Sequence, residues 1–230
     1  MTKPKEGEET SKFNGGKMAH IFQFDKDTHL YTPQTMSEEA SDALKYGTFY
    51  YKIDGSNGMI VCQENGQLLA FQRLDTRGKP IPAHCMRLPT GSNVDCYEKH
   101  SYCYEPITID VQDKKAKKKN KAMLDLVEKY KDRFSGQKYT SVEWVGTKFN
   151  KTPGVPDDVA LAIHAEQTVC EDDTPARTYE NFRSYFLETA IEGFVIEHNG
   201  VFWKIRGDGF DRKCPFALDK AAVRPPVFLV

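Results

Sequence analysis

Three short runs of strand-forming residues, separated by turn signals, constrain the fold of this chain most strongly. The runs are GTFYYKI (47–53), GMIVCQ (58–63) and LLAFQRL (68–74), all rich in aromatic or aliphatic residues. An Asp-Gly-Ser-Asn turn follows the first run, and an Asn-Gly turn signal lies between the second and the third. The pattern predicts three consecutive strands in an antiparallel meander.

Further strands and two helices are predicted along the rest of the chain. Strands are expected at 137–146 and in the hairpin 192–207, and loops at 76–93 and 151–158. The apolar segment 159–169 is compatible with a strand or a buried helix, and its shortness favours a strand. Helices are expected at 114–134 and 174–190, with apolar stripes formed by Met123, Leu126, Val127, Tyr130 and Phe134 in the first and by Tyr179, Phe182 and Phe186 in the second. This mixture predicts an α+β domain of antiparallel β-sheets flanked by helices.

Length and charge bound the domain organisation and the partners. The chain has 230 residues and a formal net charge of −1, so any nucleic-acid binding requires a local patch. The lysine run 114–121 is a solvated helix face, an RNA phosphate contact or a nuclear localisation signal. No apolar run has membrane-spanning length, and residues 1–17 lack an apolar signal core. We expect a flexible tail at 1–17, one domain at 18–230, and an intracellular protein, cytoplasmic or nuclear.

The cysteine pattern does not predict a metal centre. The six cysteines are scattered, and no two form a C-x-x-C pair. Buried free thiols are therefore expected, and a zinc site is not.

Lys52 is the candidate nucleophile, because it ends a strand immediately before the Asp-Gly turn. A lysine extending from an edge strand into solvent is the alternative interpretation. A free lysine has a pKa of about 10.4, and only its neutral amine attacks an electrophile. A divalent cation together with Lys204 and Arg206 would disfavour the ammonium form by repulsion of like charges. Gly55 would let the backbone approach a nucleotide closely.

Five motifs in fixed order carry a family resemblance: KIDGSN, FQR, VEWVG, IEGFVI and WKIRG. In this order and spacing, over residues 52–206, the chain resembles the covalent nucleotidyltransferases, which comprise ATP-dependent DNA and RNA ligases and mRNA-capping guanylyltransferases. Ser56 and Asn57 after the glycine are more similar to RNA ligases. RLDTRGKP, EWVGTKFN and EGFVIEH also resemble the vertebrate-type 5′-to-3′ RNA ligases.

The resemblance implies an ATP-dependent RNA ligase reaction in three steps. Lys52 attacks the α-phosphorus of ATP and forms lysyl-AMP, AMP moves to an RNA 5′-phosphate, and a 3′-hydroxyl then displaces AMP and seals the strand. The implied cofactor is Mg²⁺ or Mn²⁺, and the implied biological role is RNA repair.

The resemblance also implies roles for individual residues. Lys204 and Arg206, on one face of a strand, would bind the ATP phosphates. Glu192 would hold the metal through water, and Glu143 would contact the ribose or a metal. Arg73 would position the transferred phosphate or the RNA end. Asn57 would contact phosphates or the acceptor strand, although a left-handed turn residue is nearly as plausible there.

The chain departs from the family pattern in three places. No aromatic residue is available to stack on adenine in segment 159–169, so His164 or an apolar residue such as Ile163 is expected to take that place. Arg206 replaces the more usual lysine. The 24 residues after Arg206 leave no room for an OB domain. The alternatives are a capping guanylyltransferase or DNA ligase-like nucleotidyltransferase, and an inactive RNA-binding module.

The register of the 192–207 hairpin bears on the role of Glu192. A two-residue loop at Asn199 and Gly200 would turn Glu192 away from Lys204 and Arg206 under strict alternation. A three-residue loop with Gly200 in the left-handed region and a bulge would place all three on one face. We predict the three-residue loop.

Overall fold

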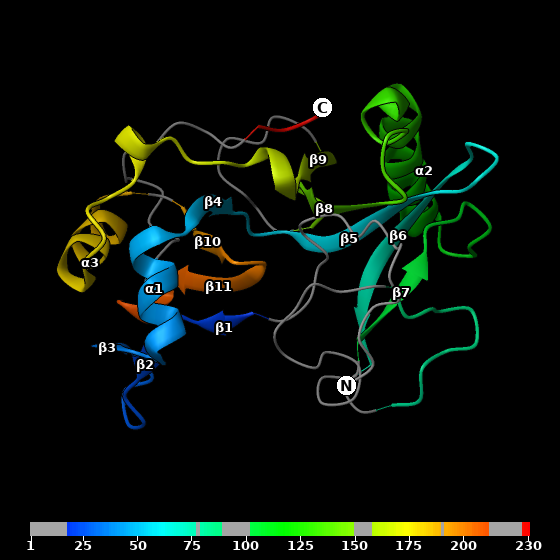
Figure 1. Cartoon of the computed structure of the whole chain (residues 1–230). Coiled ribbons are helices and arrows are strands. Elements are labelled where there is room, and N and C mark those ends of the chain that lie inside the picture. Colours follow the sequence, from blue (N-terminus) through cyan, green and yellow to red (C-terminus); the bar gives the residue numbers. More distant parts are fainter. Residues whose placement is uncertain (1–17, 77–78, 89–101, 150–157, 190, 212–226) are drawn as a thin grey trace.

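Two β-sheets, each covered by helices on one face, form the framework of the described chain (Figure 1). The structure is a computed structural model, and it describes residues 18–76, 79–88, 102–149, 158–189, 191–211 and 227–230. Its strands are β1 (Ala19–His20), β2 (Phe22–Phe24), β3 (Tyr31–Thr35), β4 (Thr48–Lys52), β5 (Ser56–Cys62), β6 (Leu68–Asp75), β7 (Tyr102–Pro106), β8 (Tyr139–Val145), β9 (Ala160–Ile163), β10 (Gly193–His198) and β11 (Val201–Arg206). Its α-helices are α1 (Glu38–Tyr46), α2 (Lys114–Lys129) and α3 (Tyr179–Glu188), and 3₁₀ turns lie at Lys131–Arg133, His164–Glu166, Glu171–Asp173 and Gly207–Gly209.

The four-stranded sheet has the order β1-β11-β10-β4 and packs against α1 and α3. Phe182 and Phe186 of α3 are fully buried against Phe194 of β10. Both helices begin at a side-chain cap, since Ser37 Oγ accepts from Ala40 N and Thr178 Oγ1 accepts from Asn181 N. One face of this sheet is therefore occupied by the core.

The five-stranded sheet has the order β7-β6-β5-β8-β9, and α2 covers one face of it (Figure 1). The predicted stripe of α2 packs here: Met123, Leu126 and Val127 are buried beside Trp144. The helix ends at Lys129, earlier than predicted, but the 3₁₀ turn that follows still buries Phe134. The described chain is thus mixed α+β with antiparallel sheets flanked by helices, as predicted; a small β2-β3 ribbon completes it.

The predicted three-stranded meander is wrong at its first connection. β5 pairs with β6 as expected, but β4 pairs with β10 in the other sheet. Residues 53–55 form a short link that passes from one sheet to the next (Figure 1). The reason is a partner from far along the sequence: β4 aligns with five residues of β10, an interaction that local turn signals cannot reveal.

The predicted three-residue hairpin loop is also wrong. His198 pairs with Val201, so the loop consists of Asn199 and Gly200 alone. Both residues have positive φ, 51° and 76°, as a type I′ turn requires. Asn tolerates this region better than most residues, which allows the tighter loop.

Other boundaries differ where tertiary contacts decide them. The strand predicted at 159–169 spans only Ala160–Ile163 and continues into a 3₁₀ turn at His164. The helix predicted at 174–190 begins at Tyr179. The sequence reading did not predict β1, β2, β3, α1 or β7. The tail at 1–17 and most of the loop at 151–158 lie outside the described residues, and the single-domain boundary stays a prediction.

Two further observations concern the thiols and the helices. Of the four cysteines in the described ranges, all are free, but only Cys103 is fully buried. Within those same ranges, no helix is long and apolar enough to cross a membrane.

Candidate active site

Lys52 and Arg206 lie in one row across the four-stranded sheet, on the face opposite α1 and α3. Gly193 pairs with Lys52 on one side and with Arg206 on the other. Because Gly193 carries no side chain, nothing from β10 stands between the lysine and the arginine. Lys204 is two residues before Arg206 and shares its face, as predicted.

Glu192 joins these two cations. Its Oε1 accepts a hydrogen bond from Lys52 Nζ at 2.6 Å and lies 3.6 Å from Arg206 Nε. The two-residue loop does not turn it away, because Glu192 precedes the first residue of β10 and strand alternation does not govern its side chain. The expectation that this register would separate Glu192 from the cations is therefore wrong.

The Glu192 carboxylate is buried and only partly neutralised. Its side chain is 8% exposed. Burial raises the pKa of Glu192, and the nearby Lys52 and Arg206 charges offset this in part. Asp54 adds to the rise through its negative charge.

Two polar atoms of this group are buried without a hydrogen bond to any part of the chain that the structure describes: Glu192 Oε2 and Arg206 Nε. Unsatisfied buried groups cost about 1–3 kcal/mol each, so they mark a place where a ligand is favoured. A carboxylate oxygen suits Mg²⁺ or Mn²⁺, and a guanidinium N–H suits a phosphate. The residues present therefore fit a divalent cation and a polyphosphate.

Arg206 is further held by an acidic neighbour. Its Nη2 donates to Asp208 Oδ2 at 2.5 Å, and its side chain remains about one-third exposed. The guanidinium is thus oriented by Asp208 while keeping access to solvent.

Glu143 and His164 form a second polar group on the five-stranded sheet. His164 Nε2 lies 3.1 Å from Glu143 Oε2, and His164 Nδ1 lies 2.8 Å from Ser141 Oγ. Each ring nitrogen of His164 therefore has a hydrogen-bond partner, and the two partners fix the orientation of the ring. The structure gives His164 a role that the sequence did not predict, namely orienting Glu143; contact with adenine stays a prediction.

Asn57 and Arg73 lie on the same face as Glu143. Asn57 pairs with Glu143 across β5 and β8, and its Oδ1 accepts from Tyr104 Oη at 2.9 Å. Asn57 is a buried strand residue, so the left-handed turn interpretation is wrong. The Arg73 guanidinium stacks 4.5 Å from the centre of the Tyr102 ring.

Gly55 lets the link after Lys52 pack closely against β8. A Cβ atom at this position would lie 2.4 Å from Trp144 O and 2.8 Å from Glu143 Cγ. The link from Lys52 thus runs directly against the backbone of β8. Gly55 is required for this close approach within the protein, and a role next to a nucleotide stays a prediction.

Several supporting residues were missed in the sequence. Ser141 precedes Glu143 by two positions and Asp208 follows Arg206 by two, so alternation along each strand offered a signal for both. Tyr104 offered only the aromatic alternation of the short run YCYEP. Asp54 adjoins the glycine of the KIDGSN motif and was not assigned a role.

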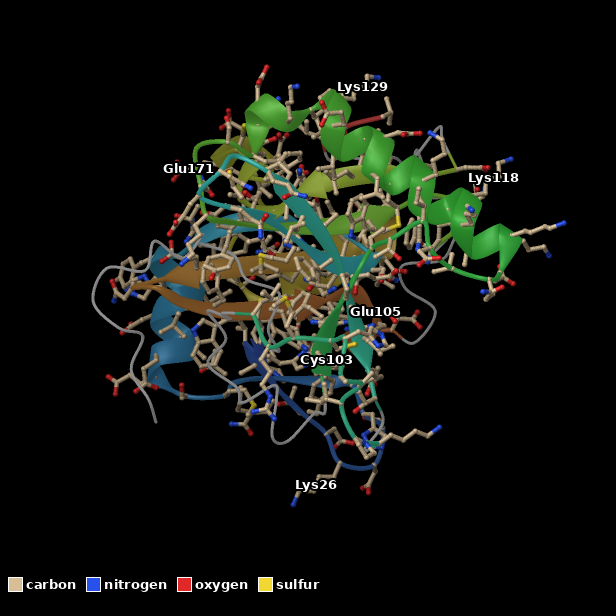
Figure 2. The ribbon with its side chains drawn as sticks, turned by 90° about the vertical axis from the view of Figure 1, so that its right-hand side faces the viewer. Lys26, Cys103, Glu105, Lys118, Lys129 and Glu171 are labelled. Carbon is tan, nitrogen blue, oxygen red and sulfur yellow. The ribbon has the colours of Figure 1, made fainter. Side chains whose placement is uncertain are left out.

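The lysine run is separated from this site by a sheet. It lies at the start of α2, on which Figure 2 labels Lys118. This helix covers the opposite face of the five-stranded sheet from Asn57 and Glu143. Lys114, Lys115, Lys117 and Lys118 are exposed. This placement favours a solvated helix face over a contact at the candidate active site.

Comparison with known proteins leaves the family open. The chain matches no protein-family model, and a search of curated proteins returns no match. The resemblance to nucleotidyltransferases therefore depends on the five motifs within this chain.

Proposed function

We propose that this protein is an ATP-dependent RNA ligase that works through a lysyl-AMP intermediate on Lys52. The observation that carries the proposal is the group formed by Lys52, Glu192 and Arg206. It combines an amine, a buried carboxylate with one unpaired oxygen, and a guanidinium with one unpaired N–H. Nucleotidyl transfer needs a nucleophile, a ligand for a divalent cation, and a group that donates hydrogen bonds to phosphate.

In the first step, Lys52 must leave its hydrogen bond to Glu192 and lose a proton to solvent. The neutral nitrogen then attacks the α-phosphorus of ATP, so that a P–N bond forms and the bond to the pyrophosphate oxygen breaks. Mg²⁺ or Mn²⁺ on Glu192 would supply positive charge beside the amine and the phosphates. Arg206 and Lys204 would stabilise the negative charge that develops on the departing pyrophosphate.

In the second and third steps, AMP passes to an RNA end. The 5′-phosphate oxygen displaces the Lys52 nitrogen from phosphorus, and a 3′-hydroxyl then displaces AMP to form the phosphodiester bond. Glu143, held by His164, is suited to accept hydrogen bonds from ribose hydroxyls. Asn57 and Arg73 are suited to phosphates of the nucleotide or of the RNA end.

The experiment that tests the proposal is self-labelling. The protein is incubated with Mg²⁺ and ATP or GTP carrying ³²P at the α-phosphate, then analysed on a denaturing gel. We expect acid-labile label from ATP only, lost in Lys52→Ala and kept in Lys26→Ala, which replaces an exposed lysine in the turn between β2 and β3. Label from GTP would favour a capping guanylyltransferase. No label from folded protein would favour an inactive RNA-binding module.

Labelled protein is then offered RNA to separate ligase from other transfer reactions. Strands that carry a 5′-phosphate and a 3′-hydroxyl should be sealed, whereas the same strands with a 5′-hydroxyl should not. Sealing of DNA in preference to RNA would contradict the assignment to RNA ligases.

A further inference from the structure

Three metal-ligating side chains, those of His84, Cys85 and Glu105, meet at the edge of the five-stranded sheet, away from the group around Lys52, and Cys103 adjoins Cys85. Edge strand β7 carries Cys103 and Glu105 (Figure 2). Segment 79–88 runs antiparallel beside it, through two backbone hydrogen bonds between Met86 and Tyr104. A turn closed by Cys85 N donating to Pro82 O then presents His84 and Cys85 toward β7.

The distances between the ligand atoms are close to those of a metal site. Ligand atoms of His84, Cys85 and Glu105 all lie within 4.8 Å of one another. His84 Nε2 is 3.0 Å from Glu105 Oε1, and the thiol of Cys85 is in contact with that of Cys103. A tetrahedral zinc site separates its ligand atoms by roughly 3.3–3.8 Å, given bonds of about 2.0–2.3 Å. Side-chain rotations would bring the ligand atoms to these separations.

We propose that His84, Cys85, Cys103 and Glu105 bind one Zn²⁺ ion. Two sulfur ligands and an imidazole select a borderline-soft transition metal, and Glu105 completes four-fold coordination. Mg²⁺ and Ca²⁺ are disfavoured, because they require oxygen ligands. This site is independent of the proposed ligase activity.

Burial and charge at the cluster are consistent with a closed structural site. Cys103 is buried, whereas the His84 and Glu105 side chains are about half exposed, so the cluster is open to solvent on the side of these two residues. Each sulfur ligand must release its proton to solvent when the metal binds, so affinity should rise with pH.

Metal binding here would fasten segment 79–88 to β7. Tyr104 lies between the two ligands of β7 and points to the other face, where its hydroxyl holds Asn57. No sequence motif indicates this cluster, because Cys85 and Cys103 are 18 positions apart and form no C-x-x-C pair. Only the pairing of segment 79–88 with β7 brings them together.

Cobalt substitution tests the site with the full chain, purified in a phosphine reductant and stripped of metal by a chelator. We expect one Co²⁺ per chain with sulfur-to-metal charge transfer in the near ultraviolet and intense tetrahedral bands in the visible, displaced by one equivalent of Zn²⁺. The double variant Cys85→Ser/Cys103→Ser should lose the charge-transfer band and at least about 100-fold in Zn²⁺ affinity. Cys62→Ser/Cys170→Ser is the matched control and should retain both.

Two further variants keep the outcome interpretable. Glu105→Gln replaces an exposed side chain, so it should weaken Zn²⁺ binding without unfolding the protein, and Lys52→Ala should bind Zn²⁺ as the wild type does. Absence of a sulfur charge-transfer band in the wild type would overturn the proposal. Unchanged Zn²⁺ affinity in the cysteine double variant would also overturn it.

Discussion

Lys52 Nζ and Glu192 Oε1 lie 2.6 Å apart, although 140 positions separate the two residues in the sequence. The contact holds the lysine at the end of β4, beside the row that Arg206 shares. The contact engages the amine, which must be released from Glu192 before it can attack an electrophile. The same carboxylate is the group best placed to take a cation, so cation binding and release of the amine would be coupled.

Replacing Glu192 by glutamine should lower self-labelling from ATP by about 100-fold, because the cation ligand is lost while the shape of the side chain is kept. Glu188→Gln, at an exposed position of α3, should label normally and is the matched control. Initial rates of labelling at saturating Mg²⁺ and ATP measure the effect. A Glu192→Gln rate within a factor of two of wild type would contradict the assigned role.

The same substitution should stabilise the protein at alkaline pH. Burial raises the pKa of Glu192, so the folded state binds a proton more tightly than the unfolded state. The wild type therefore loses unfolding free energy as pH rises from the unfolded value of about 4.3 through the raised folded value. Glu192→Gln lacks this loss, so its melting temperature should exceed that of the wild type at pH 8, and by less near pH 4. The melting temperatures of both proteins, measured at the two pH values, check this. The same difference in melting temperature at pH 8 and pH 4 would refute the prediction.

Local periodicity predicted the parts of the site that lie on a single strand. Lys204 and Arg206 share a face because alternation has a period of two, and this needs no tertiary information. The stripe of α2 was predictable for the same reason, since helical spacing places Met123 and Val127 together.

Partners from distant strands were not predictable in this way. Lys52 belongs to a different sheet from Asn57, only five residues later, because β4 finds its partner in β10. Strand alternation also predicted the wrong position for the Glu192 side chain, because Glu192 lies just before the first residue of β10. The engagement of His164 with Glu143 requires β8 and β9 to be paired in register, and no local pattern encodes that register.

His164 variants should distinguish two roles for the ring. If His164 orients Glu143, His164→Phe should lower self-labelling by about 10-fold or more, because the hydrogen bond is lost. His164→Gln should recover part of that activity, since its amide can donate to the carboxylate. If the ring stacks on adenine instead, the His164→Phe variant should be active and the His164→Gln variant should not. The KM for ATP and the maximal rate of labelling, measured for both variants, decide between them.

Gly55→Ala should destabilise the protein by about 1–3 kcal/mol, because the new methyl group overlaps the carbonyl of Trp144, which belongs to a paired strand and cannot move freely. Gly136→Ala is the matched control: its Cβ would meet no atom within 4 Å, so its stability should be unchanged or slightly higher. Urea unfolding followed by tryptophan fluorescence measures both. Equal midpoints for the two variants would show that the link does not pack against β8 as described.

The hairpin loop between β10 and β11 can be tested at Asn199. In a two-residue loop this residue has positive φ, so Asn199→Val should cost about 1–2 kcal/mol and Asn199→Gly should be tolerated. A three-residue loop would place Asn199 at negative φ and tolerate valine. His198→Val is the control, because His198 is a strand residue in the observed register. Urea midpoints should fall for Asn199→Val alone. Self-labelling should persist in all three, since the loop lies five residues, or roughly 17 Å of strand, from Arg206.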